Sequence, residues 1–120
     1  MIRDYTDLVV WQKAMDLVTE VYRLVKRLPK EELYALSDQI RRSAVSIPSN
    51  IAEGHSRSSD KELTQFLYIA RGSNAELDTQ IQIAINLGYI TADEAAVTVQ
   101  LSKETNRLIN AFLAKIQTGN

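Results

Sequence analysis

The chain has 120 residues, of which 45% are hydrophobic and 24% charged, and its 14 Lys and Arg residues against 15 Asp and Glu give a net charge of −1. It has no cysteine and one histidine, which excludes a disulfide scaffold and cysteine-bound zinc or iron–sulfur centres. No apolar run reaches the roughly 18–20 residues of a membrane span, and Met1–Tyr5 does not resemble a signal peptide. We therefore expect one cytoplasmic domain, residues 1–120.

The first predicted helix covers residues 7–28 and carries two apolar stripes, each with the three- and four-residue steps of a helix. One stripe consists of Val10, Ala14, Leu17, Val21, Leu24 and Leu28. The other consists of Leu8, Trp11, Met15, Val18, Tyr22 and Val25. A bundle needs roughly a third of a helix's circumference buried, and two full stripes exceed that. The excess indicates either an unusually wide buried face or, as we prefer, a surface that binds another copy of the chain.

The second predicted helix covers residues 30–53, with Glu31 and Glu32 in the first turn, where the helix dipole favours acidic side chains. Pro48 lies inside this range and removes one backbone hydrogen bond, so we expect a kink or a break near Val45–Ile47. Gly54 follows the last turn and is the candidate C′ residue that ends the helix.

The third and fourth predicted helices cover residues 59–86 and 91–117. Each begins with a capping-box pattern, Ser59 with Glu62 and Thr91 with Glu94. The connections are short, and helices joined in this way are usually antiparallel neighbours. The sequence therefore predicts an all-α fold, an antiparallel up-down-up-down four-helix bundle.

The sequence lacks the patterns of the common catalytic and metal sites. The residue three positions before His55 is Ala52, so the Glu-x-x-His pattern of di-metal bundles is absent. A catalytic triad would need His55 as its base, and no strand-to-helix turn presents a serine. The Gly-x-Gly-x-x-Gly and P-loop patterns are missing. We expect no enzymatic activity, cofactor, metal or small-molecule substrate.

Charged residues interrupt the apolar rhythm of the second and third predicted helices. They are Arg41, Arg42, Glu53, Arg71 and Glu76, with Gly72 between the last two. One interpretation is a set of ion pairs between neighbouring helices, with Gly72 allowing a close backbone approach. Such pairs fix register more than they add stability. The other interpretation is a polar pocket or a contact at a subunit boundary.

A basic cluster of Arg23, Lys26, Arg27 and Lys30 lies at the end of the first predicted helix. Residues 1–30 carry six basic and four acidic side chains, a net charge of +2, and residues 31–60 carry three and five, a net charge of −2. The cluster indicates either favourable charge at a helix C-terminus or, with Arg42, a patch for RNA or DNA phosphates. None of the four residues is aromatic, so we expect no base stacking.

Four stretches resemble a known family: Leu8–Ala14, Gln39–Gly54, Phe66–Ser73 with Glu76, and Leu87–Ile90. The chain is similar over nearly its whole length to four-helix-bundle proteins encoded in intervening sequences of bacterial 23S ribosomal RNA genes. The resemblance implies a small bacterial protein that assembles into a ring-like homopentamer. The family also resembles the accessory protein of diversity-generating retroelements, a basic pentamer that binds nucleic acid and a reverse transcriptase.

The resemblance implies structural or assembly roles for several positions. They are Arg41, Arg42, Asn50, Glu53, Arg71 and Glu76, which match recurrent polar positions of the family. We also expect structural or assembly roles for Trp11 and Gly72. The first hypothesis is a non-enzymatic, self-associating scaffold or adaptor. The alternative is an accessory factor that binds structured RNA or DNA, together with a reverse transcriptase, through Arg23, Lys26, Arg27 and Arg42.

Overall fold

Four α-helices make up most of the chain. The computed structural model describes residues 4–119, so Met1–Arg3, part of the segment used to judge a signal peptide, lie outside the described residues. The helices are α1 (Val9–Val25), α2 (Leu36–His55), α3 (Asp60–Asn86) and α4 (Ala92–Gln117). Residues 4–119 contain no β-strand. The all-α prediction is confirmed.

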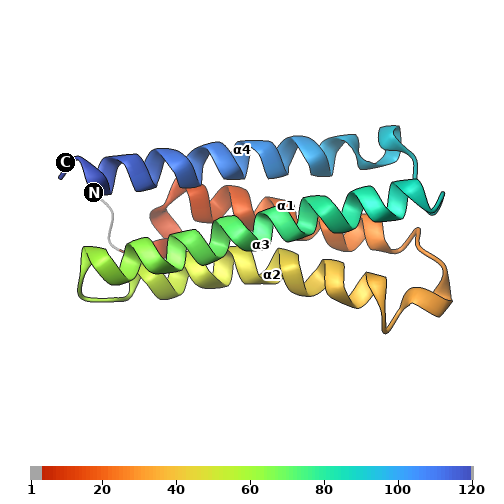
Figure 1. Cartoon of the computed structure of the whole chain (residues 1–120), viewed down its shortest axis with the longest axis horizontal. Helices are drawn as coiled ribbons and strands as arrows, with labels where there is room; N and C mark the ends of the chain where they lie inside the picture. Colours follow the sequence, from red (N-terminus) through yellow and green to blue (C-terminus); the bar gives the residue numbers. More distant parts are fainter. Residues whose placement is uncertain (1–3, 120) are drawn as a thin grey trace.

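The helices lie side by side along the long axis of a body that measures 46 × 24 × 20 Å (Figure 1). Each helix packs against two neighbours, in the closed order α1, α2, α3, α4 and back to α1. The start of α1 and the end of α4 lie at the same end of the body (Figure 1). This arrangement is consistent with the predicted up-down-up-down order, in which every short connection reverses the direction of the chain.

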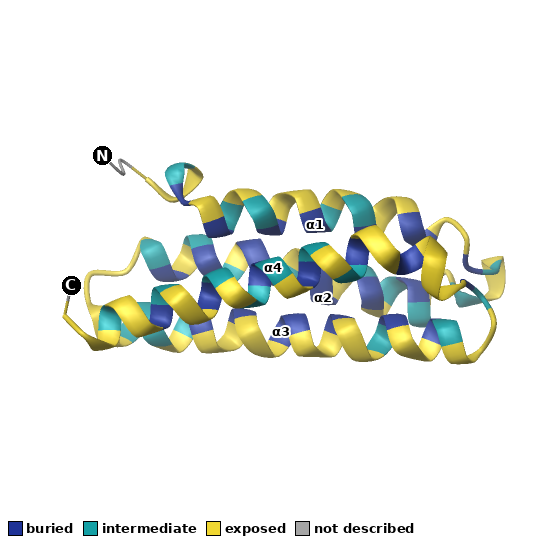
Figure 2. Cartoon of the chain, turned by 90° about the horizontal axis from the view of Figure 1, so that it is seen from above, coloured by how far each residue is buried: buried dark blue, intermediate teal, exposed yellow. Residues whose placement is uncertain are grey.

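One apolar stripe of α1 lies in the middle of the core. Buried residues line the inner sides of the helices, and exposed residues cover the outer sides (Figure 2). Ala14, Leu17 and Val21 have no exposed surface. The other helices contribute further fully buried side chains, among them Ile47, Ile51, Leu67, Leu77 and Ile109. Burial of an aliphatic side chain of this size contributes about 1.5–3 kcal/mol, so this stripe holds α1 in the bundle.

Polar side chains inside the bundle fix how α3 sits against its neighbours. The Asn74 amide donates to the backbone oxygen of Ser102 on α4, and the Ser102 hydroxyl donates to the Asn74 oxygen, both at 2.9 Å. The Ser43 hydroxyl on α2 donates to Gln80 at 2.9 Å. Every buried side-chain N or O atom in residues 4–119 has a partner. A sliding helix would leave these groups unpaired, so they favour one register.

The connection between α1 and α2 is longer than predicted. α1 ends at Val25, and α2 begins at Leu36, six residues after the predicted start at residue 30. Residues Lys30–Glu32 form a separate 3₁₀ turn after Pro29, whose backbone is extended (φ −65°, ψ 153°). The Glu32 carboxylate accepts the backbone N–H of Leu36 at 3.2 Å. Glu31 and Glu32 therefore precede α2 instead of forming its first turn, and Glu32 caps the helix.

Pro48 does not break α2. The helix is continuous from Leu36 to His55, so the expected break near Val45–Ile47 is absent. The Asn50 amide donates to the backbone oxygen of Ser46 at 2.7 Å and to the Ser46 hydroxyl at 2.9 Å. These bonds hold the turn that contains the proline, whose side chain is buried.

Gly54 and Gly72, the two glycines that lie inside helices, have roles opposite to those predicted. Gly54 lies inside α2 without a positive φ, so its assignment as the C′ residue is wrong. A Cβ atom at Gly54 would lie 2.8 Å from Cβ of Phe66, which shows that α2 and α3 approach closely there. A Cβ atom at Gly72 would meet nothing within 4 Å. The close approach predicted at Gly72 is therefore wrong.

The starts of α3 and α4 lie close to their predicted positions. The Ser59 hydroxyl accepts the backbone N–H of Glu62 at 3.2 Å. Thr91 and Glu94 form a complete capping box, in which each side chain accepts the backbone N–H of the other residue. These bonds satisfy N–H groups that a helix start leaves free, which explains why both boundaries could be located from sequence.

Candidate functional site

The second apolar stripe of α1 lies at the surface beside α2. Leu8 and Val25, at its two ends, are buried. Between them, Met15 is 40% exposed and Tyr22 is 44% exposed, while Trp11 and Val18 are half-buried. The bundle therefore buries one stripe and leaves the middle of the other accessible, as expected from the width of the apolar face.

A groove between α1 and α2 follows the first half of this stripe. We call it the Trp11 groove, and its volume is about 360 Å³. Its lining residues are Tyr5, Trp11, Met15, Val18, Val45, Pro48, Ser49 and Ala52. The Tyr5 ring meets the Trp11 ring edge-on at 5.4 Å. None of the lining residues is charged, so the groove suits an apolar or aromatic side chain.

A second groove, the Tyr22 groove, lies further along the same face, with a volume of about 380 Å³. Its lining residues are Tyr22, Val25, Lys26, Leu28, Pro29, Lys30, Leu33, Ser37 and Arg41. A hollow lined by Tyr22, Asp38, Arg41, Arg42, Val45 and Ser46 adjoins it. Since Val45 lines this hollow and the Trp11 groove, the recesses follow one another along α1 and α2.

Most of the cations predicted to contact nucleic acid are paired with carboxylates. Arg23 pairs with Glu20 one turn earlier. Arg27 pairs with Glu94 at 2.6 Å, and Arg42 pairs with Asp38 at 2.8 Å. Hydrogen bonding to Asp38, and the charge of that carboxylate, raise the pKa of Arg42. These Arg side chains are more than half exposed, so each pair is worth little in water.

The remaining basic residues line the same groove as an aromatic ring, Tyr22, which was not predicted as part of the basic cluster. Lys26 and Lys30 have no acidic partner within the described part of the chain, and both line the Tyr22 groove with Arg41. None of the four clustered cations is itself aromatic, and base stacking was therefore not expected. Tyr22 directly precedes Arg23 and lies four residues before Lys26. This i, i+4 spacing places Tyr22 and Lys26 on one face of a helix, so the sequence alone indicates that the ring lies beside the cation.

The charged residues of α2 and α3 do not form the predicted ion pairs between helices. Arg41 donates to the backbone oxygen of Leu33 at 3.1 Å and lies 4.0 Å from Asp38 on its own helix. Glu53 pairs with Arg57 at 3.2 Å, four residues further on. Ion pairs instead connect α1 and its C-terminal end with α4, through Lys13–Glu104 at 3.1 Å and Arg27–Glu94 at 2.6 Å. Arg41 and Glu53 thus have partners close to them along the chain and not on a neighbouring helix.

Two of the predicted structural positions, Asn50 and Arg71, take part in hydrogen bonds with neutral groups that connect helices. A third, Glu76, lines a polar hollow. Asn50 holds Ser46, whose hydroxyl shares a 2.7 Å hydrogen bond with that of Ser73 on α3. Arg71 donates to Asn110 on α4 at 3.0 Å, and its guanidinium lies 4.8 Å from the centre of the Tyr68 ring. Glu76 borders a hollow of about 270 Å³ between α2 and α3. That hollow is lined by Gln39, Arg42, Ser43, Ser46, Ser73, Glu76 and Gln80.

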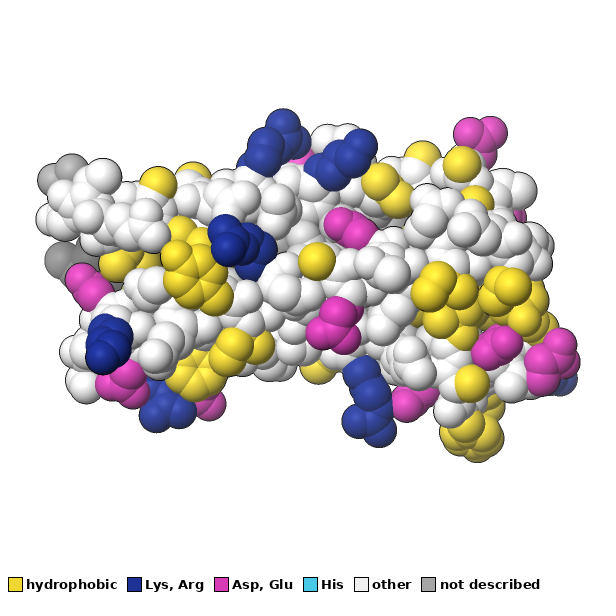
Figure 3. Space-filling model, viewed as in Figure 1, with side chains coloured by type: hydrophobic (Ala, Val, Ile, Leu, Met, Phe, Trp, Pro, Cys, Tyr) yellow, Lys and Arg dark blue, Asp and Glu magenta, His cyan; other side chains and the backbone are white. Residues whose placement is uncertain are grey.

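The face seen in Figure 3 differs from the α1–α2 face in how its charged and hydrophobic side chains are distributed. Lys and Arg lie among Asp and Glu there, without a large area of one sign, and hydrophobic side chains gather towards the two ends (Figure 3). Within residues 4–119, no group of three or more His, Cys, Asp or Glu side chains is placed to hold a metal ion. None of the helices in that range combines the length and the apolar character needed to cross a membrane. The α1–α2 face is therefore the main candidate surface.

Comparisons with known proteins agree with the fold. Residues 6–111 match the profile of the family described as 23S rRNA-intervening sequence protein. A similar solved structure is that of a protein with unknown function from the S23 ribosomal protein family of Bacteroides thetaiotaomicron VPI-5482. It is 27% identical, covers 88% of this chain and 98% of its own, and superposes with a TM-score of 0.81. No curated protein matches the chain.

Proposed function

The chain belongs to the 23S rRNA-intervening sequence protein family, and on this premise we propose that it is a non-enzymatic, cytoplasmic scaffold that self-associates, as a homopentamer, through its α1–α2 face. The observation that carries this proposal is the Trp11 groove, because an uncharged recess rimmed by exposed apolar side chains is costly to leave in water. Trp, Tyr and Met are also the residue types enriched in protein interfaces.

A charge placed in the groove tests this proposal. Met15→Glu puts a carboxylate at a position that is 40% exposed, so the single chain can still fold. Burying that carboxylate against another copy is unfavourable, and we expect assembly to weaken by about tenfold or more. Val97→Glu, on α4 at a position 61% exposed, is the matched control. Equal sedimentation of both variants and the unmodified chain would argue against an interface at this groove.

The Tyr22 groove supports a second candidate function, the binding of RNA or DNA. Lys26, Lys30 and Arg41 can face phosphates while the exposed Tyr22 ring stacks on a base. We expect binding to structured RNA or single strands to fall with rising salt, and Tyr22→Ala to weaken it without changing the salt slope. Lys26→Ala should instead reduce the slope by about one unit. Absent binding, or binding that does not respond to salt, contradicts this function.

A further inference from the structure

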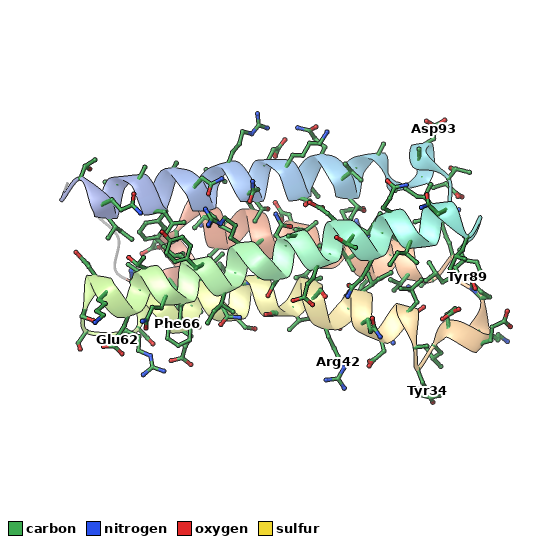
Figure 4. The ribbon with its side chains drawn as sticks, in the orientation of Figure 1. Tyr34, Arg42, Glu62, Phe66, Tyr89 and Asp93 are labelled. Carbon is green, nitrogen blue, oxygen red and sulfur yellow. The ribbon has the colours of Figure 1, made fainter. Side chains whose placement is uncertain are left out.

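Tyr34 is the most exposed large hydrophobic residue of the described chain. It is 92% exposed and follows the 3₁₀ turn Lys30–Glu32, next to Leu33, which is 45% exposed. Figure 4 shows its side chain projecting away from the four helices near the start of α2. The turn beneath it is ordered, with the backbone N–H of Ala35 donating to Glu32 at 3.0 Å. An ordered turn therefore presents an aromatic ring that the other residues of 4–119 leave almost uncovered.

The lining of the Trp11 groove suits an apolar ring that carries one hydroxyl. Its lining is apolar apart from the Ser49 hydroxyl and the polar atoms of Tyr5 and Trp11. A tyrosine needs such a site, because its ring is apolar and its hydroxyl requires one hydrogen-bond partner. Three of the lining residues belong to α1, and four, from Val45 to Ala52, belong to α2.

The ring cannot enter the groove of its own chain. Val45 and Ala52 lie 11 and 18 residues after Tyr34, most of them in α2. At about 1.5 Å per residue, α2 separates the ring from the groove by roughly 15–25 Å along the helix axis. An occupant with this chemistry must therefore come from a second molecule.

The charges beside the two surfaces are complementary. Glu31 is exposed on the turn just before Tyr34, and its carboxylate forms no ion pair with a Lys or Arg of residues 4–119. Arg41 and Arg42 line, together with Asp38, the hollow that shares Val45 with the Trp11 groove. Asp38 pairs with both arginines, so two guanidinium groups there face one carboxylate, and the Arg42 side chain is 79% exposed. A ring that enters the groove brings an acid towards these cations, which favours the correct approach over others.

From these observations we propose that Tyr34 of one copy inserts into the Trp11 groove of the next copy. The inference rests on the proposed self-association and names its contact. Because the Tyr34 ring and the Trp11 groove are different surfaces of the chain, the contact is heterologous. Each copy can insert its own Tyr34 into one neighbour and accept the Tyr34 of another. Repetition of such a contact closes into a ring when the rotation between copies allows it.

Substitution of the ring is the first test. Tyr34→Ser should weaken assembly by about tenfold or more, as expected when an aromatic anchor leaves a pocket. Tyr34→Phe keeps the ring and should retain most of the assembly. Val97→Ser is the control for the loss of an exposed apolar group elsewhere. Tyr34 has almost no contact with its own chain, so helicity and the midpoint of unfolding of the separated chain should not change.

Cross-linking is the second test, and the absence of native cysteine makes it unambiguous. One chain carries Ala35→Cys, beside the intact Tyr34, and a second, tagged chain carries Ser49→Cys in the groove. A short bis-maleimide should join the two chains in the mixture, and Tyr34→Ser in the first chain should abolish the product. Ala35→Cys mixed with Ala111→Cys, at an exposed site on α4, measures random encounter.

The outcomes separate this inference from the proposed function. Loss of assembly in Tyr34→Ser, together with a specific 35–49 cross-link, supports both. An unmodified chain that assembles, with Tyr34→Ser assembling equally well and no cross-link above the control, overturns the inference and leaves self-association standing. An unmodified chain that stays monomeric at micromolar concentration overturns both.

Discussion

The Tyr89 hydroxyl donates a 2.9 Å hydrogen bond to the carboxylate of Glu32, and so joins the α3–α4 connection to the α1–α2 connection. The other oxygen of the same carboxylate accepts the backbone N–H of Leu36 and caps α2. Tyr89 therefore helps to position the turn that presents Tyr34. At the same end of the body, Arg27 pairs with Glu94, which ties the end of α1 to the start of α4.

Tyr89→Phe should destabilise the chain in a pH-dependent way. The hydrogen bond to Glu32, together with partial burial and the charge of Glu32, raises the pKa of Tyr89. A raised pKa means that the folded state favours the neutral phenol. This stabilisation is complete below the unfolded pKa of about 10 and is lost as pH rises through the folded value. The unfolding midpoint of Tyr89→Phe should therefore lie below that of the unmodified chain at neutral pH and approach it above about pH 10.

Thermal unfolding followed by circular dichroism measures this effect. With Met15→Glu as a dissociated background for all the chains compared, Tyr34→Phe is the matched control, because it removes a hydroxyl from a ring that is 92% exposed in the single chain and should leave the midpoint unchanged. A constant gap between Tyr89→Phe and the unmodified chain across the alkaline range would show that the hydroxyl of Tyr89 is not linked to Glu32 as described.

Glu94→Gln should make the unfolding midpoint of the chain depend less on pH in the acid range. The backbone N–H of Thr91, and then the charge and hydrogen bond of Arg27, lower the pKa of Glu94. A lowered pKa gives stability that is present above the unfolded value of about 4.3 and is lost as pH falls through the folded value. Glutamine can still accept the Thr91 N–H but has no charge to lose. Unfolding midpoints between about pH 2.5 and pH 6 should fall less steeply in the variant, and parallel curves would contradict this role of Glu94.

Alanine at the two internal glycines should have opposite effects. At Gly54 the new Cβ atom meets Cβ of Phe66 at 2.8 Å, so we expect Gly54→Ala to destabilise by about 1–3 kcal/mol. At Gly72 the new methyl group meets nothing, and alanine is the better helix former, so Gly72→Ala should stabilise by about 0.5–1 kcal/mol. Urea unfolding of the three chains gives both values. A destabilising Gly72→Ala would mean that another molecule approaches α3 at this position.

The fold was predictable because local signals and apolar periodicity agree. Thr91 and Glu94 mark a helix start through bonds within four residues, so the start of α4 could be located without tertiary information. Leu17 and Met15 lie on different stripes, and packing against neighbouring helices decides that the first is buried and the second is exposed. The periodicity showed that the apolar face was too wide, but it did not show which stripe would remain outside.

The errors occurred where tertiary contacts override local preference. Gly54 looks like a helix end in sequence, but the close approach of Phe66 from α3 requires a glycine inside α2. Glu32 looks like a first-turn residue, but its carboxylate bonds to Tyr89, which lies 57 residues away. For the same reason, the sequence could not pair Lys13 with Glu104, while the pairing of Arg42 with Asp38 has the ordinary i, i+4 spacing of a helix.

The mass of the unmodified chain in solution tests the central claim, self-association, most directly. Sedimentation equilibrium or multi-angle light scattering at micromolar concentration measures it without a label or a substitution. We expect one assembled species whose mass is a multiple of the 13.5 kDa chain, five-fold for the pentamer, and we expect Met15→Glu to dissociate it. A mass of one chain across the whole concentration range would contradict it.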